Sequence, residues 1–104
     1  MNRINFLSEL IKKKQFDKAK IECEKIIKKE EKNFEFLNIF AIVLFSLKEY
    51  ENSLEKWKLA LKINAKYFDG NNNLGSALLG FEKYNDALIY LLKASEIKTD
   101  IYEL

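Results

Sequence analysis

Histidine and proline are absent from this chain of 104 residues, and cysteine, methionine and tryptophan occur once each. Without an imidazole, the common catalytic triads, proton relays and histidine-based zinc sites are excluded. The single cysteine, Cys23, excludes an intramolecular disulfide and favours a reducing, cytoplasmic setting. The first residues hold no uninterrupted apolar run, because Arg3, Glu9 and Lys12 interrupt it, so we expect no export signal.

An excess of charge of either sign is also lacking, since 18 basic and 16 acidic residues leave a net charge of +2. This balance argues against a dedicated nucleic-acid binder, which needs dense positive charge. The net charge still varies along the chain, from +4 over residues 1–33 and +1 over residues 34–67 to −3 over residues 68–104. We expect such a gradient to favour head-to-tail contact or oriented docking of a polar partner.

Long apolar runs are missing as well, because the most apolar stretch, residues 34–47, contains Glu35 and Asn38. That stretch is too short to cross a bilayer as a helix, so we expect no membrane span and interpret it as a buried core helix. With 48% hydrophobic and 33% charged residues, the composition is typical of an ordered soluble chain. The length predicts one domain over residues 1–104.

Helix-breaking residues are few, since the chain has three glycines and no proline. This predicts long helices joined by short turns. Apolar residues recur at helical spacing in six segments, which are residues 3–14, 17–30, 34–47, 51–64, 68–81 and 84–98. No window alternates apolar and polar residues as a strand does, so the predicted class is all-α.

What the sequence does contain is a repeat with a period of 34 residues. The period relates aromatic, small and bulky positions of the second helix of each unit, which are Phe16, Tyr50 and Tyr84, then Ala19, Ser53 and Ala87, then Cys23, Trp57 and Leu91. Small residues let two antiparallel helices approach closely, while bulky residues fill the space between successive hairpins. The pattern therefore predicts tandem helix hairpins.

This pattern resembles the tetratricopeptide repeat (TPR) family, most clearly in the segments 73–78 (NLGSAL) and 84–88 (YNDAL). The resemblance implies a right-handed superhelical solenoid of three antiparallel helix hairpins. Its repeats would occupy about residues 1–33, 34–67 and 68–101, with the start of a fourth at 102–104. The chain departs from the family at Arg3 and Asn71, where a bulky apolar residue is common, and at the repeat junctions, where proline is missing.

No residue constellation for catalysis is apparent. Cys23 occupies the position that Trp57 and Leu91 fill in the other repeats, so we interpret it as a core residue and not as a nucleophile. Gly70 and Gly75 lack the lysine and hydroxyl residue of a phosphate-binding loop, and we interpret Gly75 as a helix-contact residue. We therefore expect no enzymatic activity, no metal site and no cofactor.

The TPR resemblance also implies a binding surface, because the first helix of each hairpin lines a concave groove that holds peptides or partner helices in this family. Transferring the groove positions gives Asn5, Ser8, Asn38, Ile39, Ile42, Phe45, Asn72, Asn73 and Ser76. Asparagine amides can pair with any peptide backbone, and we expect those in the groove to have no role in the core. The positions that clamp acidic chaperone tails in the family hold Ile39 and Asp69 instead of cations, which favours a less charged ligand.

The leading functional hypothesis is a protein–protein interaction module that binds a peptide or a helix of another protein. The alternative is a structural or self-assembling solenoid segment of a larger TPR protein or of a homo-oligomer. This alternative rests on the apolar last hairpin, which contains Leu88, Leu91 and Leu92. We find no polar-faced capping helix after it. We therefore expect either that the chain is part of a longer repeat protein or that it self-associates through this third hairpin, most simply as a two-fold dimer. Nucleic acid and membrane are not expected partners.

Overall fold

A computed structural model describes the backbone of residues 2–102 and the side chains of residues 2–98. Within this part of the chain the backbone forms six α-helices and no strand, as expected for the all-α class. The helices are α1 (Arg3–Lys12), α2 (Phe16–Glu30), α3 (Phe34–Ser46), α4 (Tyr50–Ile63), α5 (Phe68–Gly80) and α6 (Tyr84–Tyr102). Their bounds agree with the six predicted segments to within a few residues, apart from the longer α6.

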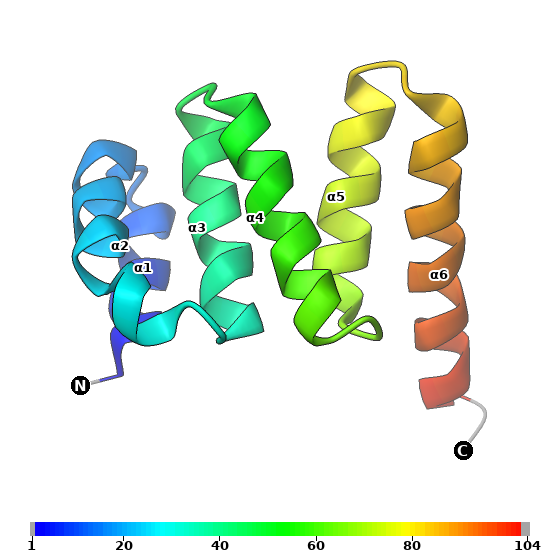
Figure 1. Cartoon of the computed structure of the whole chain (residues 1–104), viewed down its shortest axis with the longest axis horizontal. Helices are drawn as coiled ribbons and strands as arrows, with labels where there is room; N and C mark the ends of the chain where they lie inside the picture. The colour runs from blue at the N-terminus through cyan, green and yellow to red at the C-terminus, as the bar shows by residue number, and fades with distance from the viewer. Residues whose placement is uncertain (1, 103–104) are drawn as a thin grey trace.

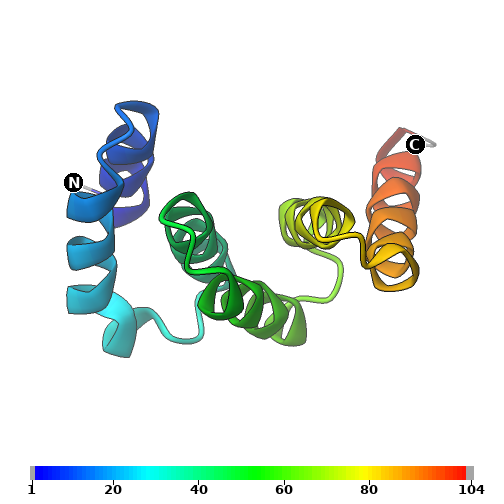
Figure 2. The same cartoon turned by 90° about the horizontal axis from the view of Figure 1, so that it is seen from above.

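The helices pair as three antiparallel hairpins, α1–α2, α3–α4 and α5–α6, that follow one another along the long axis of the molecule (Figures 1 and 2). The contacts within the second and third hairpins are the most extensive in the chain. Successive hairpins meet through α2 against α3 and α4 against α5, and α1 also contacts α3. This is the stacking order of a helical solenoid.

The turn inside each hairpin has the same backbone conformation, at positions one repeat apart. Lys14, Lys48 and Glu82 are in the left-handed region, with φ values of 57°, 65° and 62°. In the middle turn, the N–H of Lys48 donates to the carbonyl of Phe45, and the next N–H donates to the carbonyl of Leu44. These two bonds form a Schellman motif, which most often has glycine at the left-handed position.

We expect Lys48→Gly to stabilise the protein, because glycine removes the steric cost of the left-handed conformation. The gain should be about 0.5–1 kcal/mol, since glycine also raises the entropy of the unfolded chain. Thermal and urea unfolding will measure it. Lys58→Gly, at an exposed position inside α4, is the matched control and should cost about 1 kcal/mol. Equal effects of the two substitutions would contradict the turn assignment.

The small residues of the repeat lie at the helix contacts, as the sequence predicts. Ala19, Ser53 and Ala87 are at most 1% exposed. The Ser53 hydroxyl donates a hydrogen bond of 2.8 Å to the Ala41 carbonyl, which joins α4 to α3. Gly75 is also a contact residue, because a Cβ placed there would lie 2.7 Å from Cγ and Cδ2 of Leu91. The close approach of the paired helices thus depends on side chains with little or no volume.

Gly75→Ala should therefore destabilise the protein by about 1 kcal/mol, because overpacking against Leu91 outweighs the better helix propensity of alanine. The nearest backbone atom, the Leu91 nitrogen, is only 3.2 Å from the added carbon, so the neighbour has little freedom to move. Gly80→Ala is the matched control on the same helix, since nothing lies within 4 Å of its added Cβ. The control should stabilise by up to about 1 kcal/mol. Melting temperatures that shift in the same direction would contradict this contact.

The hydrophobic core divides into two clusters that meet at the middle hairpin. One cluster joins α1 and α2 to α3 through Leu7, Cys23 and Phe36, among others. The other joins α4 to α5 and α6 through Trp57, Leu74 and their neighbours. Because α3 is covered by α1, α2 and α4, nearly all of its residues from 36 to 44 are buried. This confirms that the apolar segment 34–47 is a core helix.

The junction between the second and third hairpins explains one departure from the family pattern. Asn71 is 1% exposed, and its Nδ2 donates to the carbonyl oxygens of Ala65, at 3.0 Å, and Tyr67, at 2.9 Å. The amide thus satisfies two carbonyls of a junction that lacks proline. At the next junction position the backbone does not turn, because α6 continues to Tyr102. The start of a fourth repeat at 102–104 stays a prediction, because residues 103–104 lie outside the described part.

Candidate functional site

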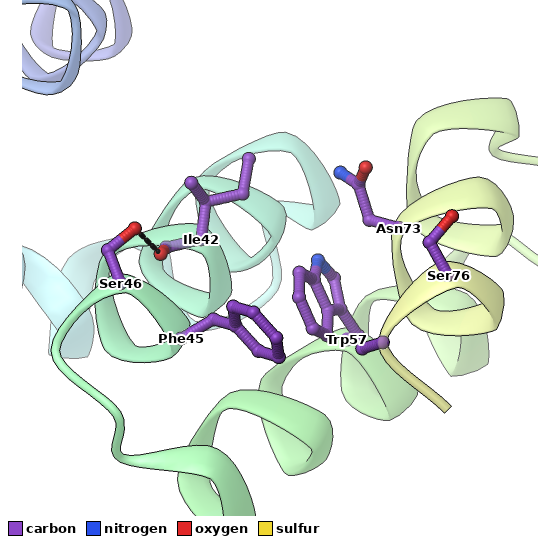
Figure 3. Close-up of a pocket in the computed structure, with 7 residues that line it drawn as sticks. Ile42, Phe45, Ser46, Trp57, Asn73 and Ser76 are labelled. Carbon is purple, nitrogen blue, oxygen red and sulfur yellow. Dashed lines mark hydrogen bonds between the residues drawn. The ribbon is translucent and has the colours of Figure 1, made fainter. Parts of the chain in front are cut away.

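A pocket of about 280 Å³ opens between α3 and α5, with Trp57 of α4 beside them (Figure 3). Its lining is largely apolar and consists of Ile42, Phe45, Ser46, Trp57, Asn73, Ser76 and Ala77. Four of these residues, Ile42, Phe45, Asn73 and Ser76, were assigned to the groove from the sequence. The structure thus brings together groove positions of the second and third repeats around one hollow.

Two rings that line this pocket, those of Phe45 and Trp57, belong to a larger aromatic cluster. The ring of Phe45 lies 5.0 Å from that of Tyr50, 5.9 Å from that of Trp57 and 6.1 Å from that of Phe81. Tyr50 and Phe81 also make an edge contact at 5.1 Å, which joins α4 to the end of α5. Because each ring contacts at least one other ring, the cluster is held in a defined geometry.

The asparagine expected in the groove at position 38 is part of the core. Asn38 is 5% exposed, and its Oδ1 accepts hydrogen bonds from Trp57 Nε1 at 2.8 Å and Asn73 Nδ2 at 3.0 Å. Its Nδ2 donates to the Tyr67 hydroxyl at 3.3 Å. The expectation that Asn38 has no core role is therefore wrong. A buried amide must find partners inside the protein, and here it joins α3, α4 and the start of α5.

We expect Asn38→Ala to lower the free energy of unfolding by about 1–3 kcal/mol, because the Trp57 N–H would lose its buried acceptor. Asn72→Ala is the control, since Asn72 is exposed on α5, and its effect should stay within about 0.5 kcal/mol. Urea unfolding followed by Trp57 fluorescence measures both variants. An Asn38 variant as stable as the control would show that the network contributes nothing.

The polar side chains of the pocket differ in what they can offer a ligand. Ser46 donates its hydroxyl to the Ile42 carbonyl at 2.9 Å, within its own helix. Asn73 uses Nδ2 for Asn38, so the oxygen of its amide is the atom that can still accept a hydrogen bond. Ser76 is exposed and can donate or accept. The α5 side of the pocket therefore presents polar groups, whereas the α3 and α4 sides are apolar.

The remaining groove candidates do not line this pocket. Ile39 is only 9% exposed and belongs to the core around α1 and α2, so the expectation that it is an exposed groove residue is wrong. Asn5 and Asn72 are exposed and Ser8 is half-buried, and none of them adjoins the pocket. Trp57 lines the pocket but was interpreted from the sequence as a packing residue, and it does pack in the core. Ala77 also lines the pocket and was not among the predicted groove positions.

The described residues offer little reactive chemistry. Cys23 is fully buried, and burial together with nearby Glu24 and Glu22 raises the pKa of its thiol to about 12. A thiol with this pKa is protonated at neutral pH and is a poor nucleophile. Among residues 2–98 no group of three or more Cys, Asp or Glu side chains is placed to hold a metal ion. No helix in the described part is long and apolar enough to cross a membrane.

Three tandem helix hairpins with small residues at their crossings define a TPR-like solenoid. The same fold occurs in solved structures of MamA, a TPR-like protein. A crystal structure of MamA superposes with a TM-score of 0.83 over 94% of this chain and 57% of that chain, at 16% sequence identity. The MamA fragment 41-end from Desulfovibrio magneticus RS-1 gives a TM-score of 0.84 over 90% of this chain and 53% of that chain, at 15% identity.

This chain therefore spans somewhat more than half the length of the MamA chains that it matches. At such low sequence identity the similarity concerns the fold alone. No protein-family profile matches the sequence. A sequence search of curated proteins also finds no significant match.

Proposed function

We propose that this protein is a non-enzymatic interaction module that binds a peptide or a helix of another protein in the groove between α3 and α5. The observation that carries the proposal is the largely apolar pocket formed by α3, α4 and α5. Its volume of about 280 Å³ is at the lower bound of small-molecule sites and suits one or two apolar side chains of a partner. A cytoplasmic setting belongs to the same proposal, because a single cysteine gives the chain no internal disulfide.

The chemistry of the pocket defines the kind of partner. Ile42, Phe45 and Trp57 supply apolar surface, so the anchor of the ligand is an aliphatic or aromatic side chain. Asn73 and Ser76 can bond the main chain next to that anchor, because an amide oxygen accepts a backbone N–H whatever the side chain. No cationic side chain lines the pocket, so recognition of a carboxylate through charge is not part of the proposal.

The chain contains its own reporter for binding, because Trp57 is the single tryptophan and lines the pocket. Peptides selected from a random displayed library should carry a hydrophobic anchor, and their titration should change the Trp57 fluorescence. Ser76→Arg should weaken the selected peptides at least tenfold, or by about 1.4 kcal/mol, because a long charged side chain would stand at the pocket. Since Ser76 is exposed, the variant should unfold at the same urea concentration as the wild type.

Asn52→Arg is the matched control, with the same gain in charge at an exposed residue of α4 that does not line the pocket. It should bind the selected peptides as the wild type does. Selected peptides that bind Ser76→Arg and the wild type equally would place recognition elsewhere. Failure of selection to yield any peptide whose binding alters Trp57 emission would count against the module itself.

A further inference from the structure

A second pocket, of about 210 Å³, lies at the junction of the second and third hairpins. It shares no residue with the pocket between α3 and α5. Residues of α4, the end of α5, the turn that follows and the start of α6 line it, namely Leu54, Lys58, Leu78, Lys83, Asp86, Ile89 and Tyr90. We call this hollow the junction pocket. It combines apolar side chains with two ammonium groups and one carboxylate.

The repeat of 34 residues offers a comparison within the same chain. Another pocket, of about 280 Å³, lies at the junction of the first and second hairpins. Six of its residues stand one repeat before residues of the junction pocket, in the pairs Lys20 and Leu54, Glu24 and Lys58, Leu44 and Leu78, Glu49 and Lys83, Asn52 and Asp86, Lys56 and Tyr90. The two pockets are thus the same feature of the solenoid, built with different side chains.

The charges of the first of these pockets satisfy one another. Lys20 Nζ donates to Glu49 Oε2 at 2.8 Å, which joins α2 to the turn before α4. Lys56 Nζ lies over the ring of Phe40, 5.5 Å from its centre, and such a contact stabilises a cation. Glu24 completes a lining in which two lysines balance two glutamates. This pocket therefore calls for no charge from a ligand.

In the junction pocket both of these glutamates are replaced by lysine. Lys58 stands in the place of Glu24 and Lys83 in that of Glu49, while Leu54 stands where a lysine pairs with Glu49. Neither Lys58 nor Lys83 forms an ion pair with another residue among 2–98. Two unpaired ammonium groups beside one hollow favour an anion, and a carboxylate can accept from both.

The other lining groups define the rest of the ligand. Asp86 adds one carboxylate, which also has no ion pair within the described side chains, so it favours a cationic group on the ligand. Leu54 and Leu78 supply apolar surface, and Ile89, which is 62% exposed, gains free energy when it is covered. The ligand thus needs an anion, a cation and a compact apolar group.

We propose that the junction pocket binds a free apolar α-amino acid, with leucine as the example. Its carboxylate pairs with Lys58 and Lys83, its ammonium with Asp86, and its side chain packs on the apolar lining. These three groups sit on one carbon atom, which suits a hollow of about 210 Å³. The last residue of a protein chain has the same carboxylate and side chain. Its neutral N–H, however, bonds a carboxylate less strongly than an ammonium does, so the free amino acid is favoured.

Titration of leucine into ¹⁵N-labelled protein, followed through the backbone amide resonances, tests the proposal. Because the charged side chains are exposed, we expect a dissociation constant of about 0.1–1 mM. The resonances of residues 83–89 should shift, whereas those of Ile42 and Phe45, which line the other pocket, should not. Leucinamide lacks the carboxylate and N-acetyl-leucine lacks the ammonium, so each should bind about tenfold more weakly.

Three variants at exposed positions separate the roles of the charged groups. Lys83→Glu introduces the residue type of Glu49 and should weaken leucine at least tenfold. Asp86→Asn introduces the residue type of Asn52 and should weaken leucine but not N-acetyl-leucine, which has no ammonium to lose. Lys93→Glu is the matched control, since it makes the same charge change on α6 outside the junction pocket and should bind leucine as the wild type does.

Unchanged resonances around the junction pocket at about 20 mM leucine would overturn the proposal, and so would equal binding by Lys83→Glu and Lys93→Glu. Tighter binding of N-acetyl-leucine than of leucine would also overturn it, because the carboxylate would then belong to the end of a protein chain. If Lys83→Glu fails to fold, Lys58→Glu gives the same test from α4. None of these measurements involves the pocket between α3 and α5, so failure here would leave the proposed peptide site untouched.

Discussion

The hydrogen bonds of the buried Asn38 amide hold together the part of the molecule in which the pocket lies. The Asn38 oxygen accepts from Trp57 of α4 and Asn73 of α5, and its nitrogen donates to Tyr67 at the start of α5. Two of these partners, Trp57 and Asn73, line the pocket. The helices α3 and α5 are not joined by a turn, so the chain itself does not fix the distance between them. The hydrogen bond from Asn73 to Asn38 fixes that distance, and with it the width of the groove. A purely apolar contact would not specify that distance as closely, because hydrophobic attraction has little directionality.

The pocket also follows from the way a solenoid distributes its core. The apolar residues of each hairpin pack within the hairpin and also against its neighbours, and the two hydrophobic clusters meet at α3 and α4. Phe45 and Trp57 therefore have two roles, since they pack in the cluster shared with α5 and α6 and also face the open space between α3 and α5. A side chain held by other rings is ready for a ligand without further ordering, which lowers the entropic cost of binding.

The sequence predicts the helices, their pairing and the small residues at their crossings, because these depend on local spacing and on a period that repeats. Ser53 and Gly75 could be assigned in this way. The sequence does not predict that Asn38 and Ile39 are buried, since groove positions were taken from the family pattern and not from the neighbours that surround them here. Burial of Asn38 depends on Trp57, Tyr67 and Asn73, which are 19, 29 and 35 residues away along the chain. The sequence also does not predict the left-handed backbone conformation at Lys14, Lys48 and Glu82, because none of these positions is a glycine.

The two ends of the solenoid differ in a way that follows from side-chain chemistry alone. The first hairpin exposes the charged residues Arg3, Glu9 and Lys13, whereas α6 exposes Leu88 and Leu92. A charged face remains hydrated, while an exposed apolar face gains free energy when it is covered. The pocket is formed by α3, α4 and α5 and contains none of the exposed apolar residues of α6. A ligand between α3 and α5 would therefore leave these residues of α6 uncovered.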